Sequence, residues 1–537
     1  MSAMTYQAVR QAFSWQTVHD TLGWTGKETV NLGATIIDRH ADSDATALIW
    51  VARDGAERRI AYRELAEASN RFANLLTRLG VRKGDRVAAL MPRVPEGLAA
   101  LLGAFKVGAI YVPIFTGFGP DAVRFRLEHS QVKLLVTHQE VRSQVPADAA
   151  TRIVCVNPDP AALQQGDLDF AAETARESER FEPVQCRRDE VAAIIYTSGS
   201  TGQPKGGAIA TNFLAAIWPY VTYGVDLRED DIFWPTGDPG WGYGFVCYLA
   251  ALTAGVPIVS VQANPTPALC LELIERYGIT NLATTPTLLR SLMAADAAPK
   301  SPVRTISSCG EPLNDKVVDY FRRVWSVTPL DHFGATEYAL PIGNYAGIDM
   351  AVKPGSMGLP CPGFTMAVVD EAGNELPAGK VGMIGKKADE NCLYWLLYWN
   401  DETATRNLVR QGWIVTGDLA SRDADGYFWF EGRADDMIKS AGYRIGPFEV
   451  ESALLKHPAV AEAGVIGKPD ALKGQIVKAF ILLKTGVAAS DALSDELAGF
   501  VKRTLGRHQY PREIEFVDSL PKTATGKIQR FVLRQRP

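Results

Sequence analysis

A run of hydroxyl and glycine residues, Tyr196-Thr-Ser-Gly-Ser-Thr-Gly-Gln-Pro-Lys-Gly206, follows the apolar segment 191–196. Small residues let backbone N–H groups and hydroxyls converge on phosphate oxygens, and Lys205 adds a positive charge. The run is not a Walker A loop, because Pro204 stands where that pattern needs its second glycine and Gly206 follows the lysine in place of Ser or Thr. The sequence therefore predicts a phosphate-binding loop made of Thr197, Ser198, Gly199, Ser200, Thr201, Gly202 and Lys205.

Four further regions accompany this run, and together they resemble the adenylate-forming superfamily of acyl-CoA synthetases, carrier-loading adenylation domains and luciferases. The resemblance is strongest to acetyl-CoA and medium-chain acyl-CoA synthetases, and it covers about Ala45 to Arg530. The order of the motifs is that of the superfamily, which is more specific than one glycine-rich loop. The first three regions are Ser308–Pro312, Asp331–Glu337 and Gly412–Asp418, and the fourth is a C-terminal region with two stretches, Gly432–Ile445 and Pro521–Ile528.

The resemblance implies a site for ATP and magnesium. Thr336 would contact phosphate and Glu337 would hold Mg²⁺, a hard cation that prefers carboxylate and phosphate oxygens. Asp418, which is acceptor-only when ionised, would accept hydrogen bonds from both ribose hydroxyls. The remaining nucleotide contacts would be Gly310, Glu311 and Pro312 beside adenine, Asp331, His332, Phe333 and Phe430 around the pocket, and Arg433 beside Asp418.

The C-terminal motifs imply a domain that acts in two steps. Lys527 would be the adenylation lysine and Asp435 the hinge about which the domain turns. Arg444 would contact phosphate, and Gly442 would lie where the pantetheine arm of coenzyme A passes, because only glycine lets backbone and ligand approach so closely. Arg126 matches a contact to the CoA nucleotide in acetate-type members.

The pocket for the acid is expected around Gly334, where acetate-specific members of the superfamily carry a tryptophan. Loss of an indole deepens a cavity, and each buried methylene of a substrate contributes about 0.8 kcal/mol. We therefore expect an acid longer than acetate, branched, or aromatic. The residues expected to line this pocket are Trp241, Gly242, Tyr243, Cys309 and Gly334.

The elements that position these residues follow from hydrophobic spacing. The segment 62–79 carries one apolar stripe and predicts a helix that ends at Gly80, and it precedes the predicted strand 86–91. Strands and helices continue to alternate to about Val369, which favours layered α/β subdomains with parallel strands. The charge-free stretch 239–271 contains Gly255 and Pro257, so it indicates a buried helix and strand instead of a membrane span.

The residue composition and the hydrophobic pattern change twice after this region. Between Val369 and Phe430 the chain is rich in turns and β-forming residues, which predicts a β subdomain. From Pro447 a helix, two strands and a further helix predict a small mobile α+β domain. We place the domains at residues 1–434, for AMP and acyl binding, and 435–537.

Composition narrows the class of protein. The chain has 537 residues, a net charge of −5 and seven scattered cysteines. This balance gives no broad cationic field for nucleic acid, and the cysteines suit reduced thiols in the cytoplasm. No apolar core of a secretory signal follows Met1, and no metal-ligand spacing of His or Cys occurs.

The predicted function is therefore an AMP-forming acyl-CoA synthetase that uses ATP, Mg²⁺ and coenzyme A. Its acid would be a short- to medium-chain fatty acid longer than acetate. An aryl-CoA ligase of benzoate type and a stand-alone adenylation enzyme that loads a carrier protein remain alternatives, and the chain is expected to be a monomer or a homodimer. A serine esterase is disfavoured because no GxSxG motif occurs.

Overall fold

The computed structural model describes residues 4–149, 151–158, 166–197, 204–389, 393–434, 436–440, 443–470, 473–505, 509–522 and 528–536. Within it, the first large sheet forms around β4, which lies between β5 and β6, and these strands run parallel as predicted. The predicted helix over 62–79 is α4, and its apolar stripe, with Phe72 and Leu76, is fully buried against α5. In order, the sheet contains β21 (Trp395–Tyr398), β11 (Lys205–Ala210), β10 (Val191–Thr197), β5 (Ile110–Ile114), β4 (Arg86–Leu90), β6 (Leu134–His138), β7 (Arg152–Val156) and β8 (Leu168–Asp169). Its helices are α4 (Tyr62–Arg78), α5 (Pro95–Val107), α6 (Pro120–His129), η2 (Gln139–Gln144) and α7 (Phe170–Thr174).

The second large sheet is also mainly parallel, and its strands β12 to β16 are joined by helices. Its two edges end in antiparallel pairs, β16 with β17 and β2 with β3. In order, the sheet contains β18 (Leu359–Pro360), β17 (Ala339–Gly343), β16 (Pro329–Ala335), β15 (Thr305–Cys309), β14 (Asn281–Thr284), β12 (Phe233–Pro235), β13 (Ile258–Val261), β2 (Thr46–Val51) and β3 (Glu57–Ala61). The helices between the strands are α10 (Pro267–Tyr277), α11 (Pro286–Ala294) and α12 (Asp315–Val324).

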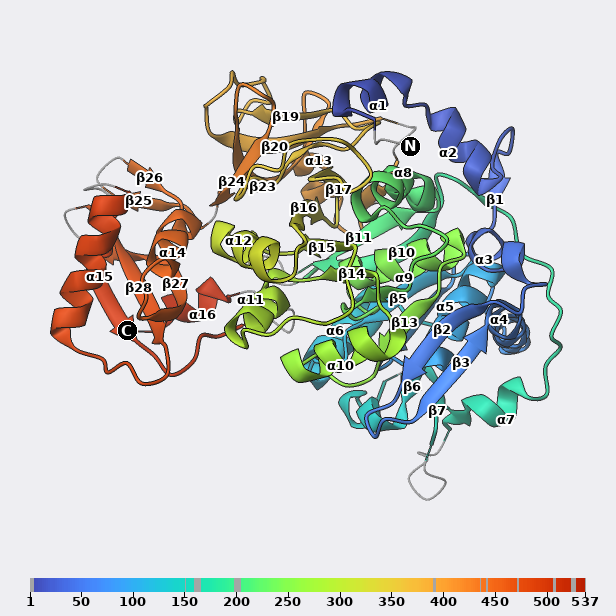
Figure 1. Cartoon of the computed structure of the whole chain (residues 1–537). Helices are drawn as coiled ribbons and strands as arrows, with labels where there is room; N and C mark the ends of the chain where they lie inside the picture. The colour runs from blue at the N-terminus through green and yellow to red at the C-terminus, as the bar shows by residue number, and fades with distance from the viewer. Residues whose placement is uncertain are drawn as a thin grey trace.

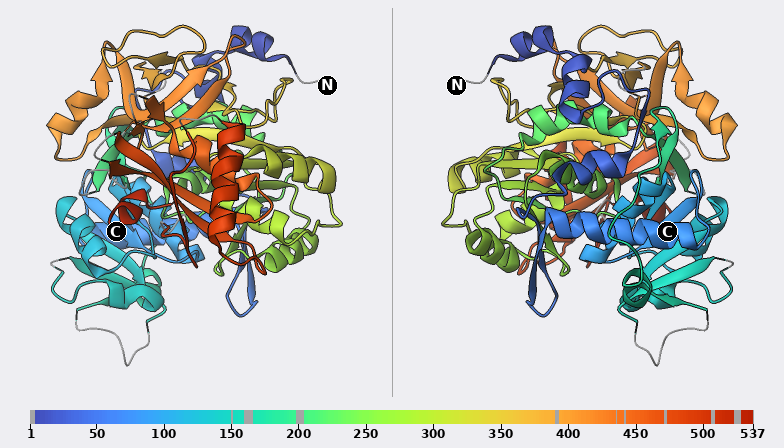
Figure 2. Two further views of the ribbon diagram at one scale, coloured as in Figure 1. Left: turned by 90° about the vertical axis from the view of Figure 1, so that its left-hand side faces the viewer. Right: turned by 90° about the vertical axis from the view of Figure 1, so that its right-hand side faces the viewer.

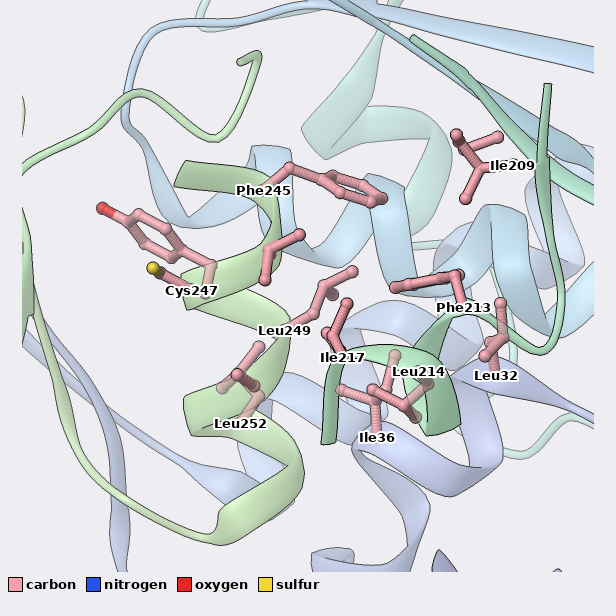
Figure 3. Close-up of a cluster of buried hydrophobic side chains, with 14 of the residues drawn as sticks. Leu32, Ile36, Ile209, Phe213, Leu214, Ile217, Phe245, Cys247, Leu249 and Leu252 are labelled. Atoms are coloured by element: carbon pink, nitrogen blue, oxygen red, sulfur yellow. The ribbon is translucent and has the colours of Figure 1, made fainter. Parts of the chain in front are cut away.

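A helical layer packs into the core between the two sheets. Helices α8 and α9 contact each other, and Phe213 and Ile217 of α8 face Phe245 and Leu249 of α9 (Figure 3). Helix α9 is the helix predicted inside the charge-free stretch, and no helix among the described residues is long and apolar enough to cross a membrane. This layer and the N-terminal segment comprise α8 (Phe213–Pro219), the π-helical turn η3 (Tyr220–Val225), α9 (Gly242–Ala254), α1 (Tyr6–Ala12), α2 (Trp15–Leu22), α3 (Leu32–Ile36), η1 (Asp38–His40) and the strand pair β1 (Thr29–Val30) with β9 (Cys186–Arg187).

The predicted β subdomain is a third, antiparallel sheet. The turn-rich segment 370–381 joins β19 to β20, and the segment 423–427 joins β23 to β24. In this sheet Asp418 of β23 is paired directly with Arg433 of β24. The elements are β19 (Met366–Val369), β20 (Gly382–Lys387), β22 (Val409–Arg410), β23 (Trp413–Arg422), β24 (Phe428–Arg433) and the helix α13 (Glu402–Leu408).

The C-terminal region has its own sheet and its own buried cluster, which includes Ile438, Val465 and Leu497. Figure 1 shows it in red beside α11 and α12, and it lies in front in the left view of Figure 2. The described hydrophobic clusters of this region contain no residue that precedes Ile438, which is the pattern of a separate α+β domain. Its elements are β25 (Ile438–Ser440), β26 (Tyr443–Ile445), α14 (Pro447–Leu455), β27 (Val460–Asp470), β28 (Gly474–Leu483), α15 (Asp491–Thr504), β29 (Glu513–Phe516) and α16 (Arg530–Arg534).

Contacts between the two regions come mainly from α14. Lys316 Nζ of α12 donates to the carbonyl of Leu455 at 2.9 Å, and Lys456 lies 3.2 Å from the carboxylate of Asp315. The rings of Phe430 and Phe448 also meet, with centroids 6.1 Å apart. The interface therefore combines one aromatic contact with polar contacts at its edge.

Candidate active site

A cavity of about 690 Å³ opens between the N-terminal part and the C-terminal domain. The ends of β10, β15 and β16 and the middle of β23 reach it from one side, and α14 and α16 reach it from the other. The carboxyl ends of parallel strands are where α/β sheets usually bind ligands. Eighteen of the residues predicted for the site line this cavity, and Ile195 and Tyr196 of β10 lie beside them: Thr197, Lys205, Trp241, Gly242, Tyr243, Cys309, Gly310, Glu311, Pro312, Asp331, His332, Phe333, Gly334, Thr336, Glu337, Asp418, Phe430 and Arg433.

Glu337 is held by a partner that the motifs did not indicate. Its carboxylate accepts a hydrogen bond from the hydroxyl of Tyr398, which belongs to β21. The side chain is buried, and this burial raises its pKa above the ordinary value. Strand β11 brings the group together, because Gly207 pairs with Tyr398 and a Cβ at Gly207 would lie 2.7 Å from Thr336 Cγ2. Glycine at 207 therefore allows the Thr336–Glu337 pair to approach the strand.

Lys205 approaches the same group from the start of β11. Its ammonium lies 5.1 Å from the centroid of the Tyr398 ring, and its backbone carbonyl accepts a 3.4 Å hydrogen bond from Thr197 Oγ1. Strands β10 and β11 are antiparallel, so the glycine-rich loop joins two strands. A helix N-terminus therefore does not follow this loop, and of the residues predicted to bind phosphate here the structure places Thr197 and Lys205 at the cavity.

Asp418 carries a prepared set of hydrogen bonds. Thr416 Oγ1 donates to Asp418 Oδ2 at 2.6 Å, and Arg433 Nη1 donates to Asp418 Oδ1 at 3.4 Å. The backbone N–H of Thr416 donates to the hydroxyl of buried Tyr338 at 2.8 Å, which fixes the strand beside the carboxylate. A carboxylate has about four acceptor positions, so these two donors leave capacity for the hydroxyls of a diol.

The paired ends of β15 and β16 form a slot for a planar group. Ser308 pairs with Asp331 and Cys309 with His332, so the strands deliver Gly310 and Phe333 side by side. Phe333 and Phe430 approach with ring centroids 6.5 Å apart. Asp331 is buried, which raises its pKa to about 7, and it accepts a 3.3 Å hydrogen bond from the N–H of Leu313. Glu311 is anchored outside the slot by Arg290 and Thr287, each at 2.6 Å.

The opposite end of the cavity is built from small and aromatic residues. Gly242 begins α9, and a Cβ there would meet nothing within 4 Å, so its missing side chain is open space. Gly334 differs, because a Cβ there would lie 2.4 Å from the carbonyl oxygen of Ala339 and 2.8 Å from Leu340 Cδ2. The backbone of β17 thus occupies part of the space that a side chain at 334 would need. The sequence predicts that the depth of the acid pocket comes from Gly334, whereas in the structure the open space lies at Gly242.

Arg126 does not face the cavity. It is only 3% exposed, and its guanidinium lies 3.9 Å from the Phe118 ring centroid and donates to the carbonyl of Ala122 at 2.7 Å. Burial lowers its pKa to about 10. In this arrangement the guanidinium packs in the interior, so a contact with the nucleotide of coenzyme A requires a rearrangement of α6 and stays a prediction.

Several predicted residues fall outside the described residues. They are Ser198, Gly199, Ser200, Thr201 and Gly202 of the loop, and Asp435, Gly442 and Lys527 of the C-terminal motifs. For Arg444 the structure gives the backbone, which belongs to β26. Their roles stay predictions.

The C-terminal domain contributes charged residues that the motifs did not single out. Arg530 of α16 forms an ion pair with Glu451 of α14 at 2.7 Å and lies 3.5 Å from Asp436, and all three line the cavity. Tyr398, Thr416 and Arg290 are further cavity residues that were missed. Tyr398 reaches Glu337 through the pairing of β21 with β11, Arg290 reaches Glu311 from helix α11, and Thr416 lies two residues before Asp418 in the same strand.

The residues present fit a magnesium ion that arrives with a nucleotide. No group of three or more His, Cys, Asp or Glu side chains within the described ranges forms an all-protein metal cage. Mg²⁺ in nucleotide sites is instead bound through one or two carboxylates together with substrate phosphates. Glu337, beside Thr336 and Lys205 in the cavity, is a carboxylate of this kind.

Comparison with known proteins agrees with this geometry. The AMP-binding enzyme family matches residues 37–387, and the AMP-binding enzyme C-terminal domain matches residues 449–527. The fold and the family match are those of an AMP-forming acyl-CoA ligase. The chain belongs to the AMP-binding enzyme family, as the sequence motifs predicted.

Relatives and solved structures cover nearly the whole chain. Acetyl-coenzyme A synthetase of Bacillus subtilis is 39% identical over 98% of this chain and 94% of its own length. An acyl-CoA synthetase of Brucella canis is similar in structure with a TM-score of 0.79, at 38% identity over 99% of this chain and 98% of that one. A benzoate CoA ligase of Burkholderia xenovorans has a TM-score of 0.82, at 30% identity over 94% of this chain and 100% of that one. The similar proteins thus differ widely in the acid that their names give.

Proposed function

We propose that this enzyme activates a carboxylic acid larger than acetate in two steps and transfers it to coenzyme A. In the first step the carboxylate attacks the α-phosphorus of ATP, which forms the acyl-adenylate and releases pyrophosphate. In the second step the thiolate of coenzyme A attacks the acyl carbon and releases AMP. The observation that supports a larger acid is the open space at Gly242, which lines the cavity together with Tyr243 and Cys309.

The described residues divide the work of the first step. Asp418 accepts from the ribose hydroxyls, with Thr416 and Arg433 fixing its orientation. The slot between Phe333 and Phe430 takes the adenine, and Lys205, Thr197 and Thr336 contact the phosphates. When bound, Mg²⁺ neutralises charge on the phosphates, and Glu337 holds it from the protein side. We assign the adenylation charge to Lys527, the hinge to Asp435, the phosphate contact to Arg444, and the passage of pantetheine to Gly442.

Two alternatives concern the partners of the reaction. A benzoate-type acid is favoured by the aromatic lining of the cavity end, Trp241 and Tyr243, and by the similarity to a benzoate CoA ligase. Transfer to a carrier protein would use the same acyl-adenylate. It differs from transfer to CoA only in the thiol that accepts the acyl group. We also propose that the enzyme works in the reducing cytoplasm, since the six described cysteines are buried and none of them forms a disulfide.

A screen of acids tests this proposal. Pyrophosphate release by the full-length chain is measured with ATP, Mg²⁺ and straight-chain acids from C2 to C12, branched acids and benzoates, first without and then with CoA. We expect activity to rise from acetate toward larger acids and thioester to form with CoA. Acetate as the best acid would contradict the proposed pocket, and thioester formation only on a phosphopantetheine-bearing carrier would favour the carrier-loading alternative.

A further inference from the structure

A chain of hydrogen bonds runs from the acyl end of the cavity into the protein interior. Tyr243, which lines the cavity, has its hydroxyl 3.0 Å from the hydroxyl of Tyr220. The Tyr220 hydroxyl lies 3.0 Å from His332 Nδ1, and His332 Nε2 lies 2.6 Å from the backbone carbonyl oxygen of Asn344. Four residues from four separate segments thus form one line.

The donor and the acceptor of each hydrogen bond in this line follow from its inner end, where His332 meets the carbonyl oxygen of Asn344. A carbonyl oxygen only accepts, so Nε2 of His332 must carry a proton. Burial lowers the pKa of His332 to about 4, so near neutral pH the ring holds one proton and Nδ1 is an acceptor. Tyr220 must then donate to His332, and its oxygen must accept from Tyr243. The single proton of the Tyr243 hydroxyl is therefore directed away from the cavity.

The surrounding backbone fixes both ends of this line. A Cβ at Gly343 would lie 2.6 Å from His332 Cδ2, and a Cβ at Gly244 would lie 2.2 Å from the carbonyl oxygen of Asp238. Glycine at these positions lets β17 pack against the imidazole and lets the first turn of α9, which carries Tyr243, pack against its preceding loop. Tyr220 and His332 are 1% and 2% exposed, so water does not compete for their bonds.

We propose that Tyr243 determines specificity by presenting only a hydrogen-bond acceptor to the acid, so that the enzyme prefers carboxylic acids that carry a hydroxyl or amino group on the chain or ring. This inference rests on the proposed function and names the substrate class of that site. A hydroxyl oxygen accepts two hydrogen bonds, so the contact with the neighbouring Cys247 thiol leaves an acceptor position for a substrate. Burial also raises the Tyr243 pKa well above its usual value, so the group stays a neutral phenol.

Reversal of the line is disfavoured. If Tyr220 donated to Tyr243, then Nδ1 of His332 would be a buried acceptor without a donor. If Tyr243 donated to an acceptor on the substrate, the Tyr220 oxygen would lose the bond that it accepts. A substrate donor adds a hydrogen bond without breaking one, whereas a substrate acceptor exchanges one bond for another.

The test compares matched acids that differ only in the donor. For the full-length enzyme, kcat/KM is measured as pyrophosphate release with ATP and Mg²⁺. Each carboxylic acid that carries a hydroxyl or amino substituent is compared with the acid that carries a methyl group at the same position. The series covers C4 to C8 chains and the three ring positions of benzoate. For the wild type we expect at least one position at which the donor is favoured about 10-fold, the size of one net hydrogen bond.

Two variants separate the role of Tyr243 from mere packing. Tyr243→Phe keeps the ring and the Tyr220–His332 bond, and we expect the donor-to-methyl ratio to fall to 1 or below. Tyr220→Phe frees the Tyr243 proton, and we expect the preference to move toward acids with an oxo group. Because Tyr220→Phe leaves a buried acceptor unpaired and lowers stability, Tyr243→Phe is the primary variant.

The outcomes distinguish this inference from the proposed function. If the wild type activates acids but the methyl analogue is equal or better at every position, the specificity inference is overturned and the proposed function stands. The same holds if Tyr243→Phe leaves the donor-to-methyl ratio unchanged. If no acid yields pyrophosphate, the proposed function fails and the inference fails with it.

Discussion

The two ends of the cavity are built on different principles. At the nucleotide end, charged groups are paired in advance: Asp418 with Thr416 and Arg433, and Glu337 with Tyr398. At the acyl end, the lining is Gly242, Tyr243, Cys309 and other uncharged residues, and shape decides what fits. Pre-oriented charges bind one fixed ligand, while a lining of small residues changes its capacity with a single methyl group. The family can therefore keep ATP and vary the acid.

The largest expected effect concerns the charge delivered to the nucleotide end. Lys527→Ala should slow pyrophosphate release by ~10² or more, the order found when a charge-stabilising group is removed. Thioester formation from supplied acyl-adenylate should be retained, because the proposed second step does not use this lysine. Stopped-flow measurement of each step separately checks this.

A lysine on the same domain provides the matched control. Lys502→Ala, on the exposed side of α15, should leave both steps unchanged. Equal loss of both steps in Lys527→Ala would contradict a C-terminal domain with separate roles in the two steps.

The next effect is at the ribose position. Asp418→Asn removes the charge that Thr416 and Arg433 orient, and it should lower kcat/KM for ATP by ~10- to 100-fold, the range for hydrogen bonds to a charged group. The loss should lie mainly in KM for ATP, while KM for the acid should not change. If the variant lowered kcat/KM for the acid and left kcat/KM for ATP unchanged, the assignment of Asp418 to the ribose would be contradicted.

A smaller effect is expected for the partner of Glu337. Tyr398→Phe removes the hydroxyl that orients the carboxylate, and loss of an outer-shell partner lowers metal affinity by ~10-fold or more. When activity is titrated with Mg²⁺, the variant should need a higher Mg²⁺ concentration for half-maximal activity than the wild type. The aromatic ring is kept in this variant, so its packing should not change. Tyr394→Phe, a buried tyrosine of the same segment, is the control; an equal shift in both variants would argue against a specific role for Tyr398.

At the acyl end the comparison turns on two glycines. Gly242→Val fills open space and should lower kcat/KM for the largest accepted acid by ~10-fold or more while sparing small acids, since pocket volume discriminates by this order. Gly334→Ala instead meets the Ala339 carbonyl, so it should impair every acid alike. Activity profiles of the two variants across acid length check this, and identical profiles would refute the assigned difference.

The smallest effect is on stability. Burial raises the pKa of Asp331 to about 7 in the folded chain, against about 3.9 when unfolded. The stability that this protonated carboxyl contributes is present below the unfolded pKa and is lost as pH rises through about 7. Asp331→Asn lacks this loss, so the difference in Tm, variant minus wild type, should increase from pH 5 to pH 8. Calorimetry without nucleotide measures it, and a constant difference would contradict the raised pKa.

Much of the fold was predictable because its signals are local. The stripe of α4, the apolar strand β4, and the two turn-rich hairpins of the β subdomain were predicted close to their observed bounds. The nucleotide motifs were also predictable, since strand ends β15 and β16 carry them as short consecutive segments. Local periodicity and turn chemistry are sufficient for such elements.

The rest depends on contacts between distant segments. Tyr398 reaches Glu337 only because β21 pairs with β11, and His332 reaches Tyr220 only because η3 packs against β15 and β17, the two strands that flank β16. The depth at Gly334 could not be judged either, because the backbone of Ala339 that fills it depends on the β16–β17 hairpin. The spacing of residues along the sequence does not give the distances between these segments in the folded chain.

The polar contacts of α14 with α12 have a consequence for turnover. Lys456 and Asp315 are each 42% exposed on their side chains, and an ion pair of this kind contributes about 0–1 kcal/mol and is screened by salt. This ion pair thus contributes little electrostatic free energy to the contact between the two regions, and added salt removes most of that contribution. The rate at which the enzyme passes between its two half-reactions should therefore respond to ionic strength, even though neither half-reaction involves these two side chains.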